Sequence, residues 1–281
     1  MTLKLVLSTD NWRPEWWGVE RCFARIRELG VKHVELTTAT GYNLLEGLGF
    51  SPYVSVDHDP YLIRDLLEKY GLHLESIDAD WPIWDHNSIG VLNKTIVWAD
   101  MLGCRTIITT DSDRYPEGRT DEEWLAIIKY HFSCVLPVAR RHGVRIAVEP
   151  HGRLTTKPDA LLRIVTQNGS DHIGVNFDTG NSFIAGEDPV AFLEKVKDRV
   201  IHVHAKDVSA GRAAAMRGEE TGIASSEAAL GEGVNAENIS RCLDILIATG
   251  REIPVSPEAG GDALTVKSVL WLQDLLRRKG Q

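Results

Sequence analysis

The sequence lacks the features that mark membrane, secreted and nucleic-acid-binding proteins. No stretch approaches the ~18 consecutive apolar residues that a bilayer-spanning helix requires, and the opening residues MTLKLVLSTDNW lack the apolar core and cleavage motif of a signal peptide. The four cysteines form no C-x-x-C pair, which is typical of reduced thiols. Acidic residues outnumber basic ones by 40 to 31, so a strong positive field for phosphate binding is missing. We therefore expect a cytoplasmic protein with neither a membrane nor a nucleic acid as partner.

The sequence does contain a regular alternation of short β-rich runs and longer amphipathic runs. With 281 residues, 43% of them hydrophobic, the chain is long enough for one large core. The predicted strands are 3–9, 33–38, 72–79, 105–110, 144–150, 172–178, 200–206 and 253–258. The predicted helices are 15–29, 60–70, 88–102, 121–142, 158–168, 189–197, 236–249 and 263–279. Eight such repeats in one chain favour a closed parallel barrel, so we predict an α/β fold, a single (β/α)₈ TIM barrel over residues 1–281.

An open doubly wound sheet is the competing architecture. It usually has fewer strands and a G-x-G-x-x-G motif in the first turn between strand and helix, whereas that turn here reads STDNWRPEWWG. The barrel is therefore the better interpretation. Three segments after strand ends are long, 38–59, 78–88 and 207–235, and in a barrel such loops surround the substrate pocket.

Side chains that can bind metal stand at the ends of four consecutive predicted strands. They are Glu149 in AVEPHG, Asp178 in VNFDTGN, His204 in HVHAKD and Glu258 in PVSPEAGG. In a barrel these strand ends meet at one face, where three carboxylates would repel one another without a cation. This oxygen and nitrogen set suits one divalent metal ion, Mn²⁺, Mg²⁺, Co²⁺ or Zn²⁺. Because thiolates are missing, it does not fit a closed structural zinc site.

Each of these four residues also has a purely structural interpretation. Glu149 before Pro150 fits a strand-end carboxylate bonded to a neighbouring amide, and Asp178 fits a cap of the following turn. His204 fits a neutral core histidine, and Glu258 fits an ordinary loop acid. Their joint occurrence at four successive strand ends favours the shared metal site.

Further polar residues lie on the same strand as His204. His202 stands two residues earlier and points to the same side. We expect it either in the core or holding a carboxylate that orients a metal ligand. Lys206 continues this face outward, where it either binds a substrate oxyanion or pairs with Glu232 or Asp207.

The order VEPHG … NFDTGN … HVHAKD … GEG … PEAGG resembles the xylose isomerase-like TIM-barrel superfamily over essentially the whole chain. More narrowly, it is similar to the sugar phosphate isomerase/epimerase group that includes ketose 3-epimerases and inosose dehydratase. The resemblance implies one divalent metal, manganese first, held by Glu149, Asp178, His204 and Glu258. It also implies that Glu149 and Glu258 act as acid and base on a keto-sugar. They would remove a proton next to a metal-bound carbonyl, through an enediolate.

Two departures separate this chain from the ketose 3-epimerases. Asn181 stands where those enzymes have a histidine after the Asp ligand, and the arginine that follows their strand-seven histidine is missing, the next one here being Arg212. The superfamily's DNA-repair branch also needs extra histidines at these places. The segment 213–239 is similar to catalytic subunits of C-glycoside deglycosidases, which implies elimination from a 3-oxo-sugar as an alternative reaction.

The sequence therefore leaves three functions open. The first is a metal-dependent sugar isomerase or epimerase, the second a lyase or dehydratase, and the third a non-catalytic metal- and sugar-binding subunit. We expect a small sugar as partner, with a homo-oligomer or a small partner subunit as further options. His151, two residues past Glu149, is a third candidate base or a substrate hydrogen-bond partner. The remaining candidates for substrate contact are Asn181, Lys206, His202, Trp12, Trp81, Glu35 and Asp111. For Trp12, Trp81, Glu35 and Asp111, an anchoring role is the alternative.

Overall fold

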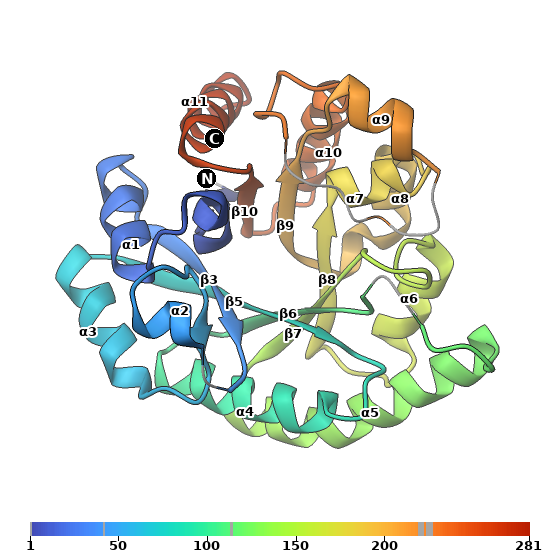
Figure 1. Cartoon of the computed structure of the whole chain (residues 1–281). Helices are drawn as coiled ribbons and strands as arrows, with labels where there is room; N and C mark the ends of the chain where they lie inside the picture. Colours follow the sequence, from blue (N-terminus) through green and yellow to red (C-terminus); the bar gives the residue numbers. More distant parts are fainter. Residues whose placement is uncertain (1, 42, 113–114, 219–221, 223–226) are drawn as a thin grey trace.

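The strands form a ring that the first strand completes in two pieces. β1 (Leu3–Leu5) pairs in parallel with β10 (Ile253–Glu258), and β2 (Leu7–Ser8) pairs in parallel with β3 (His33–Ala39). Between β10 and β3 the ring continues through β9 (Val200–Lys206), β8 (Ile173–Asp178), β7 (Arg145–Glu149), β6 (Thr106–Thr110) and β5 (His73–Pro82). This computed structural model describes residues 2–41, 43–112, 115–218, 222 and 227–281. It confirms the predicted (β/α)₈ TIM barrel (Figure 1).

Helices follow the strands and surround them as an outer ring (Figure 1). Those that match the predicted helices are α1 (Val19–Glu28), α3 (Pro60–Tyr70), α4 (Ser88–Met101), α5 (Asp121–His142), α6 (Pro158–Thr166), α8 (Pro189–Val196), α10 (Ala236–Ala248) and α11 (Asp262–Arg278). α5 illustrates why the predicted and observed helix ends agree. Thr120 and Glu123 form a capping box at its start, and Gly143 ends it with a φ of 64°. In the described part of the chain, every helix is too short or too polar to cross a bilayer.

The fold differs from the prediction mainly in short elements. The strand predicted over 3–9 ends at Ser8, and Thr9–Glu15 forms a 3₁₀ helix, η1. The helix predicted from residue 15 begins only at Val19, because Trp16 has a left-handed φ of 56° that ends η1. Further short elements that the prediction missed are α2 (Leu44–Gly47), β4 (Val54–Ser55), α7 (Thr179–Ile184), η2 (Lys197–Arg199) and α9 (Ala210–Met216).

Side chains alternate between the outer and inner faces of the ring. On β9, Val203 belongs to the apolar core. His202 points to the inside, since it contacts Ser76 from β5 across the barrel. His204 and Lys206 share this inner face and are buried as well. Barrel interiors are usually filled by branched apolar side chains, so this polar interior indicates a site rather than ordinary packing.

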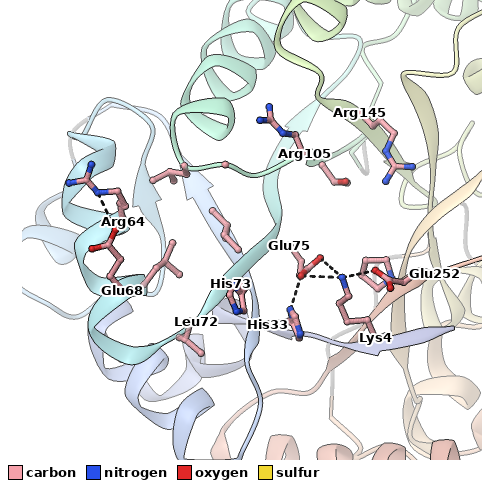
Figure 2. Close-up of a pocket in the computed structure, with 16 residues that line it drawn as sticks. Lys4, His33, Arg64, Glu68, Leu72, His73, Glu75, Arg105, Arg145 and Glu252 are labelled. Carbon is pink, nitrogen blue, oxygen red and sulfur yellow. Dashed lines mark hydrogen bonds and ion pairs between the residues drawn. The ribbon is translucent and has the colours of Figure 1, made fainter. Parts of the chain in front are cut away.

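A cavity of about 670 Å³ opens at the N-terminal ends of the strands, away from His204 and Lys206 (Figure 2). Lys4 is ion-paired there with Glu75 and Glu252, and His33 lies 2.6 Å from Glu75. The charged groups that meet at its centre are thus paired with one another. This end of a (β/α)₈ barrel generally serves stability, and the C-terminal end carries the active site. We therefore place the candidate active site at the C-terminal end.

Candidate metal and active site

The four predicted metal ligands meet at the C-terminal ends of β7, β8, β9 and β10. Each of Glu149, Asp178, His204 and Glu258 offers one donor atom, and these atoms all lie within 4.8 Å of one another. Parallel strands in register bring this about, because Asp178 pairs with His204 across β8 and β9. The predicted convergence is therefore present in the structure. Metal binding itself stays a prediction.

The orientation of His204 fits a cation at this position. Its Nε2 lies 3.0 Å from Glu35 Oε1, whereas its Nδ1 faces the cluster, 2.6 Å from Glu258 Oε1 and 3.3 Å from Glu149 Oε2. A neutral ring that donates Nε2–H to Glu35 points the Nδ1 lone pair at carboxylate oxygens, which is unfavourable unless a cation lies between them. His204 Nδ1 and Asp178 Oδ2 are among the buried side-chain atoms of the described residues that lack a hydrogen bond of good geometry.

The charge of the cluster also favours a cation. Three carboxylates face one ammonium, that of Lys206. Burial lowers the pKa of His204, but the carboxylates of Glu35, Glu258 and Glu149 raise it more, to well above its usual value. The same negative field that attracts a proton to this ring attracts a divalent ion, so the donor set fits the predicted metal.

Glu149 is held by two amides beneath the cluster. Its Oε1 accepts a hydrogen bond from Asn181 Nδ2 at 2.8 Å and its Oε2 one from Asn176 Nδ2 at 3.1 Å. Burial raises the pKa of Glu149 to about 7, although His204 opposes this shift. A carboxylate that exchanges a proton near neutral pH is suited to acid–base work. The predicted substrate contact of Asn181 is thus replaced by a contact with Glu149.

Asp178 combines both roles that the sequence left open. Oδ1 accepts hydrogen bonds from the backbone N–H groups of Gly180 and Asn181 and caps α7. Oδ2 faces the cluster, 2.9 Å from Lys206 Nζ. Capping therefore fixes the carboxylate so that its second oxygen faces the cluster beside Lys206.

Lys206 turns inward, contrary to one of its two predicted roles. Its Nζ contacts Asp178 Oδ2, Glu258 Oε2 and Asn181 Oδ1. The predicted partners are engaged elsewhere: Glu232 pairs with Lys267, and the carboxylate of Asp207 accepts backbone N–H groups of 231–235. Pairing of Lys206 with Glu232 or Asp207 was therefore wrong. Contact with a substrate oxyanion stays a prediction.

A buried polar chain supports the cluster from below. His202 Nδ1 lies 3.0 Å from Asn176 Oδ1, and His202 Nε2 lies 3.1 Å from Ser76 Oγ. Ser76 Oγ donates to Glu35 Oε2 at 2.7 Å, and Glu35 continues to His204. Burial lowers the pKa of His202 to about 4, so this ring is neutral. The structure thus places His202 and Glu35 in contact with residues of the cluster, and their predicted contact with substrate stays a prediction.

Glu258 connects the cluster to open space. Its side chain is 22% exposed, whereas the three other ligand-type side chains are nearly or fully buried. It lines a cavity of about 380 Å³ at the mouth of the barrel, a size suited to a small ligand. Burial raises the pKa of Glu258, but Lys206 and His204 lower it further, so it is ionised. Of the three predicted bases, Glu258 is the one with access to this cavity.

His151 lies partly exposed on a loop that Asp111 fixes. The Asp111 carboxylate accepts hydrogen bonds from the backbone N–H groups of Gly152, Leu154 and Thr155. Asp111 is fully buried by these contacts, which supports its anchoring role and leaves no room for substrate. His151 itself is not among the clustered donor atoms, so its role as a base stays a prediction.

The tryptophans divide between anchoring and open roles. Trp12 is fully buried and donates from Nε1 to Asp262, so it anchors η1 instead of stacking on substrate. Trp84 likewise donates to the carbonyl of Asp111. Trp81, at the end of β5, is partly exposed, and its predicted contact with substrate stays open.

Sequence reasoning missed Asn176 and Ser76, although a signal for Asn176 was available. It stands two residues before Asp178, on the inner face of the same strand. Part of the segment 213–239, namely 219–221 and 223–226, lies outside the described residues, so its likeness to deglycosidase subunits has no structural counterpart to report.

A family model described as "Xylose isomerase-like TIM barrel" matches residues 23–275. The chain belongs to this family. The assignment confirms the resemblance carried by the strand-end motifs, and it fits a xylose isomerase-like barrel whose polar cluster lies at the C-terminal strand ends.

Two curated relatives are identical to this chain at about a quarter of the aligned positions. It is 25% identical over 230 residues to the rhizopine catabolism protein MocC of Rhizobium meliloti, which covers 74% of this chain and 65% of MocC. It is 26% identical over 168 residues to inosose dehydratase of Geobacillus kaustophilus, which covers 53% of this chain and 54% of that enzyme. The matches thus span less than two thirds of either relative's length.

Solved structures with the same xylose isomerase-like barrel align over nearly the whole chain. A D-tagatose 3-epimerase-like protein superposes with a TM-score of 0.75 at 20% identity, covering 98% of this chain and 97% of its own. The IolI protein with a bound zinc atom superposes with a TM-score of 0.72 at 14% identity, covering 98% and 95%. At such identities the likeness shows the fold.

Proposed function

We propose that this chain is a divalent-metal-dependent isomerase or epimerase that moves a proton beside the carbonyl group of a keto-sugar. The observation that carries the proposal is the cluster of Glu149, Asp178, His204 and Glu258 at the barrel mouth, with Glu258 open to a cavity. The sugar-modifying relatives and the zinc in IolI support it. Mn²⁺ is the first expectation, with Mg²⁺, Co²⁺ and Zn²⁺ as alternatives.

The metal would be held by the four clustered residues. When bound, it supplies Lewis acidity that makes the proton next to a carbonyl easier to remove. Glu258, which borders the cavity, takes this proton. Glu149, whose pKa burial raises to about 7, gives its own proton to the substrate, and proton exchange with water then restores both glutamates. Lys206 contacts both Asp178 and Glu258 and so keeps the latter ionised.

Replacement of Glu258 by Gln tests this proposal. An amide of the same shape cannot take a proton, so we expect exchange of the α-proton of a keto-sugar for deuterium in D₂O to fall by about 10²- to 10⁴-fold. Metal content per chain, measured by elemental analysis, should fall as well, because an anionic ligand is lost.

Glu232→Gln is the matched control, since Glu232 is half exposed and its ion-pair partner among the described residues is the surface residue Lys267. It should leave both readouts unchanged. Full exchange with unchanged metal content in the Glu258 variant would show that the cluster is not the catalytic site.

A dehydratase is the second candidate, favoured by the alignment with inosose dehydratase. The same base could remove the proton, after which a neighbouring substituent leaves instead of a proton returning. A substrate panel that includes inososes and 3-oxo-glycosides separates the two reactions. Isomerisation retains the mass of the sugar apart from deuterium, whereas dehydration yields a product lighter by one water.

A further inference from the structure

The cavity beside Glu258 has a second wall that the metal cluster does not use. Asp10 and Arg13 of η1 line it together with Glu258. Both belong to the loop that follows the first strand, at the C-terminal end of the barrel. A substrate whose reacting carbon lies at Glu258 would therefore share this cavity with Asp10 and Arg13.

Asp10 is held in a fixed orientation across two loops. Its Oδ1 accepts a hydrogen bond from the hydroxyl of Tyr53 at 2.6 Å, and Arg13 donates to the same hydroxyl at 3.0 Å. Tyr53 comes from the long loop between β3 and α3, 43 residues away in the chain. Asp10 Oδ2, by contrast, accepts no hydrogen bond from the residues that the structure describes, in a side chain that is 36% exposed.

Asp10 is not the residue that attaches η1 to the barrel. Its neighbour Asn11 attaches η1 to the barrel, with Nδ2 donating to the Pro257 carbonyl and Oδ1 accepting the backbone N–H of Ala259. The adjacent residues Asp10 and Asn11 thus have different roles. Asn11 secures the loop, and Asp10 presents a carboxylate oxygen to the cavity.

The charges around the cavity select against anionic substrates. Among the described lining residues, Arg13 is the one cation, and it lies 3.7 Å from Asp10, while Glu227 pairs with Arg212. A phosphate or carboxylate group would meet the carboxylates of Asp10 and Glu258 without a free cation to balance it. A carboxylate oxygen without a donor is instead suited to accept the protons of sugar hydroxyl groups.

We propose that Asp10, positioned by Tyr53 and Arg13, binds the hydroxyl groups of a neutral sugar at the end away from the reacting carbonyl. The inference rests on the proposed function, which supplies the position of the reacting carbon. It narrows the substrate class to unphosphorylated keto-sugars or polyols that are long enough to reach from Glu258 to Asp10.

The test compares wild type, Asp10→Asn and Tyr53→Phe in the metal-loaded protein. The first readout is the preference for a neutral ketohexose over dihydroxyacetone, as kcat/KM for deuterium exchange. The second is the binding of D-mannitol by calorimetry, which requires no turnover. We expect Asp10→Asn to lower both the preference and the mannitol affinity about 10- to 100-fold, the range for losing hydrogen bonds to a charged group, and Tyr53→Phe to lower them less.

Asp65→Asn on the exposed face of α3 is the matched control and should change neither readout. Unchanged values in Asp10→Asn, or no mannitol binding to wild type, overturn the subsite. A preference of wild type for ketohexose 6-phosphates that Arg13→Ala removes overturns the neutral substrate class. Asp10-dependent mannitol binding without any proton exchange supports the subsite and counts against the proposed isomerase alone.

Discussion

Several residues at the barrel mouth perform two tasks with different atoms. Asp178 caps α7 with Oδ1 and faces the cluster with Oδ2. Glu35 likewise accepts from Ser76 with Oε2 and meets His204 with Oε1. Because each carboxylate oxygen has its own hydrogen-bond or ion-pair partner, the network tolerates these buried charges.

Glu35→Gln should weaken metal binding without removing a ligand. Burial raises the pKa of Glu35, but His204 and His202 lower it further, to about 2, so it carries a full charge toward the Nε2 of His204. Loss of that charge frees the ring to rotate or change tautomer. We expect metal affinity to fall about 10- to 100-fold, measured by competition with a chromophoric chelator.

Glu75→Gln provides a matched control, because Glu75 also contacts a histidine, His33, but at the opposite end of the barrel. Metal affinity should be unchanged in that variant. Equal affinities of wild type and Glu35→Gln would mean that His204 is oriented by other contacts.

The clustered donors could be predicted from the sequence because strand ends of a parallel barrel necessarily meet. The contacts of Lys206 could not be predicted in this way, because they depend on its neighbour Gly180, which has no side chain. A Cβ on Gly180 would lie 2.6 Å from Lys206 Cγ, so the inward path of the lysine exists only because residue 180 is glycine. Sequence spacing carries no information about such a fit between the start of α7 and the end of β9.

At the scale of elements, long periodic segments were predictable and short ones were not. α5 has 22 residues, a capping box and a terminal glycine, so its pattern determines its ends. η1 has seven residues that hold their place through Asn11 and Trp12, which contact β10 and α11 far along the chain. No local pattern predicts an element whose stability comes from such distant contacts.

The loop that carries His151 depends on one carboxylate from another strand end. Asp111 accepts three backbone N–H groups and the hydroxyls of Thr155 and Tyr115. In Asp111→Asn, the amide nitrogen faces donors in either orientation, so some of them lose their acceptor. We expect the free energy of unfolding to fall by about 2–3 kcal/mol, measured by urea denaturation, with faster proteolysis of this loop.

Asp159→Asn serves as the control for the Asp111 variant. Asp159 is largely exposed, and in the part of the chain that the structure describes its ion-pair partner is the half-exposed Lys195, so its replacement should change stability by less than about 0.5 kcal/mol. Wild-type stability in Asp111→Asn would show that the loop is held mainly by its own backbone contacts.

At the scale of the whole molecule, the barrel is closed by contacts between the first and last elements of the chain. Thr2 and Gln281 are hydrogen-bonded, and the ends of the chain lie side by side next to β10 (Figure 1). Outside the strands, closure rests on Asp262 at the start of α11. Its carboxylate accepts two hydrogen bonds from Arg25 of α1, at 2.8 and 2.9 Å, and one from Trp12. First and last helices are thereby joined across the seam.

Asp262→Asn should destabilise the barrel in a pH-dependent manner. The hydrogen bonds of Arg25 hold the pKa of Asp262 below its usual value, so the ionised form is favoured in the folded state. This stabilisation is complete above the pKa of the unfolded chain, about 3.9, and is lost as pH falls through the lower folded-state value. We expect the variant to be about 1–3 kcal/mol less stable than wild type at pH 7, and the difference to shrink below about pH 4.

Urea denaturation of both proteins between pH 3 and pH 7 measures this difference. Asp274→Asn, at the exposed far end of the same helix, should be close to wild type throughout, because its arginine partners are largely exposed. A stability loss in Asp262→Asn that stayed constant down to pH 3 would assign the effect to altered packing of Trp12 instead of the ion pair. A pH-dependent loss would show that one charged contact between the first and last helices stabilises the closed ring on which the site depends.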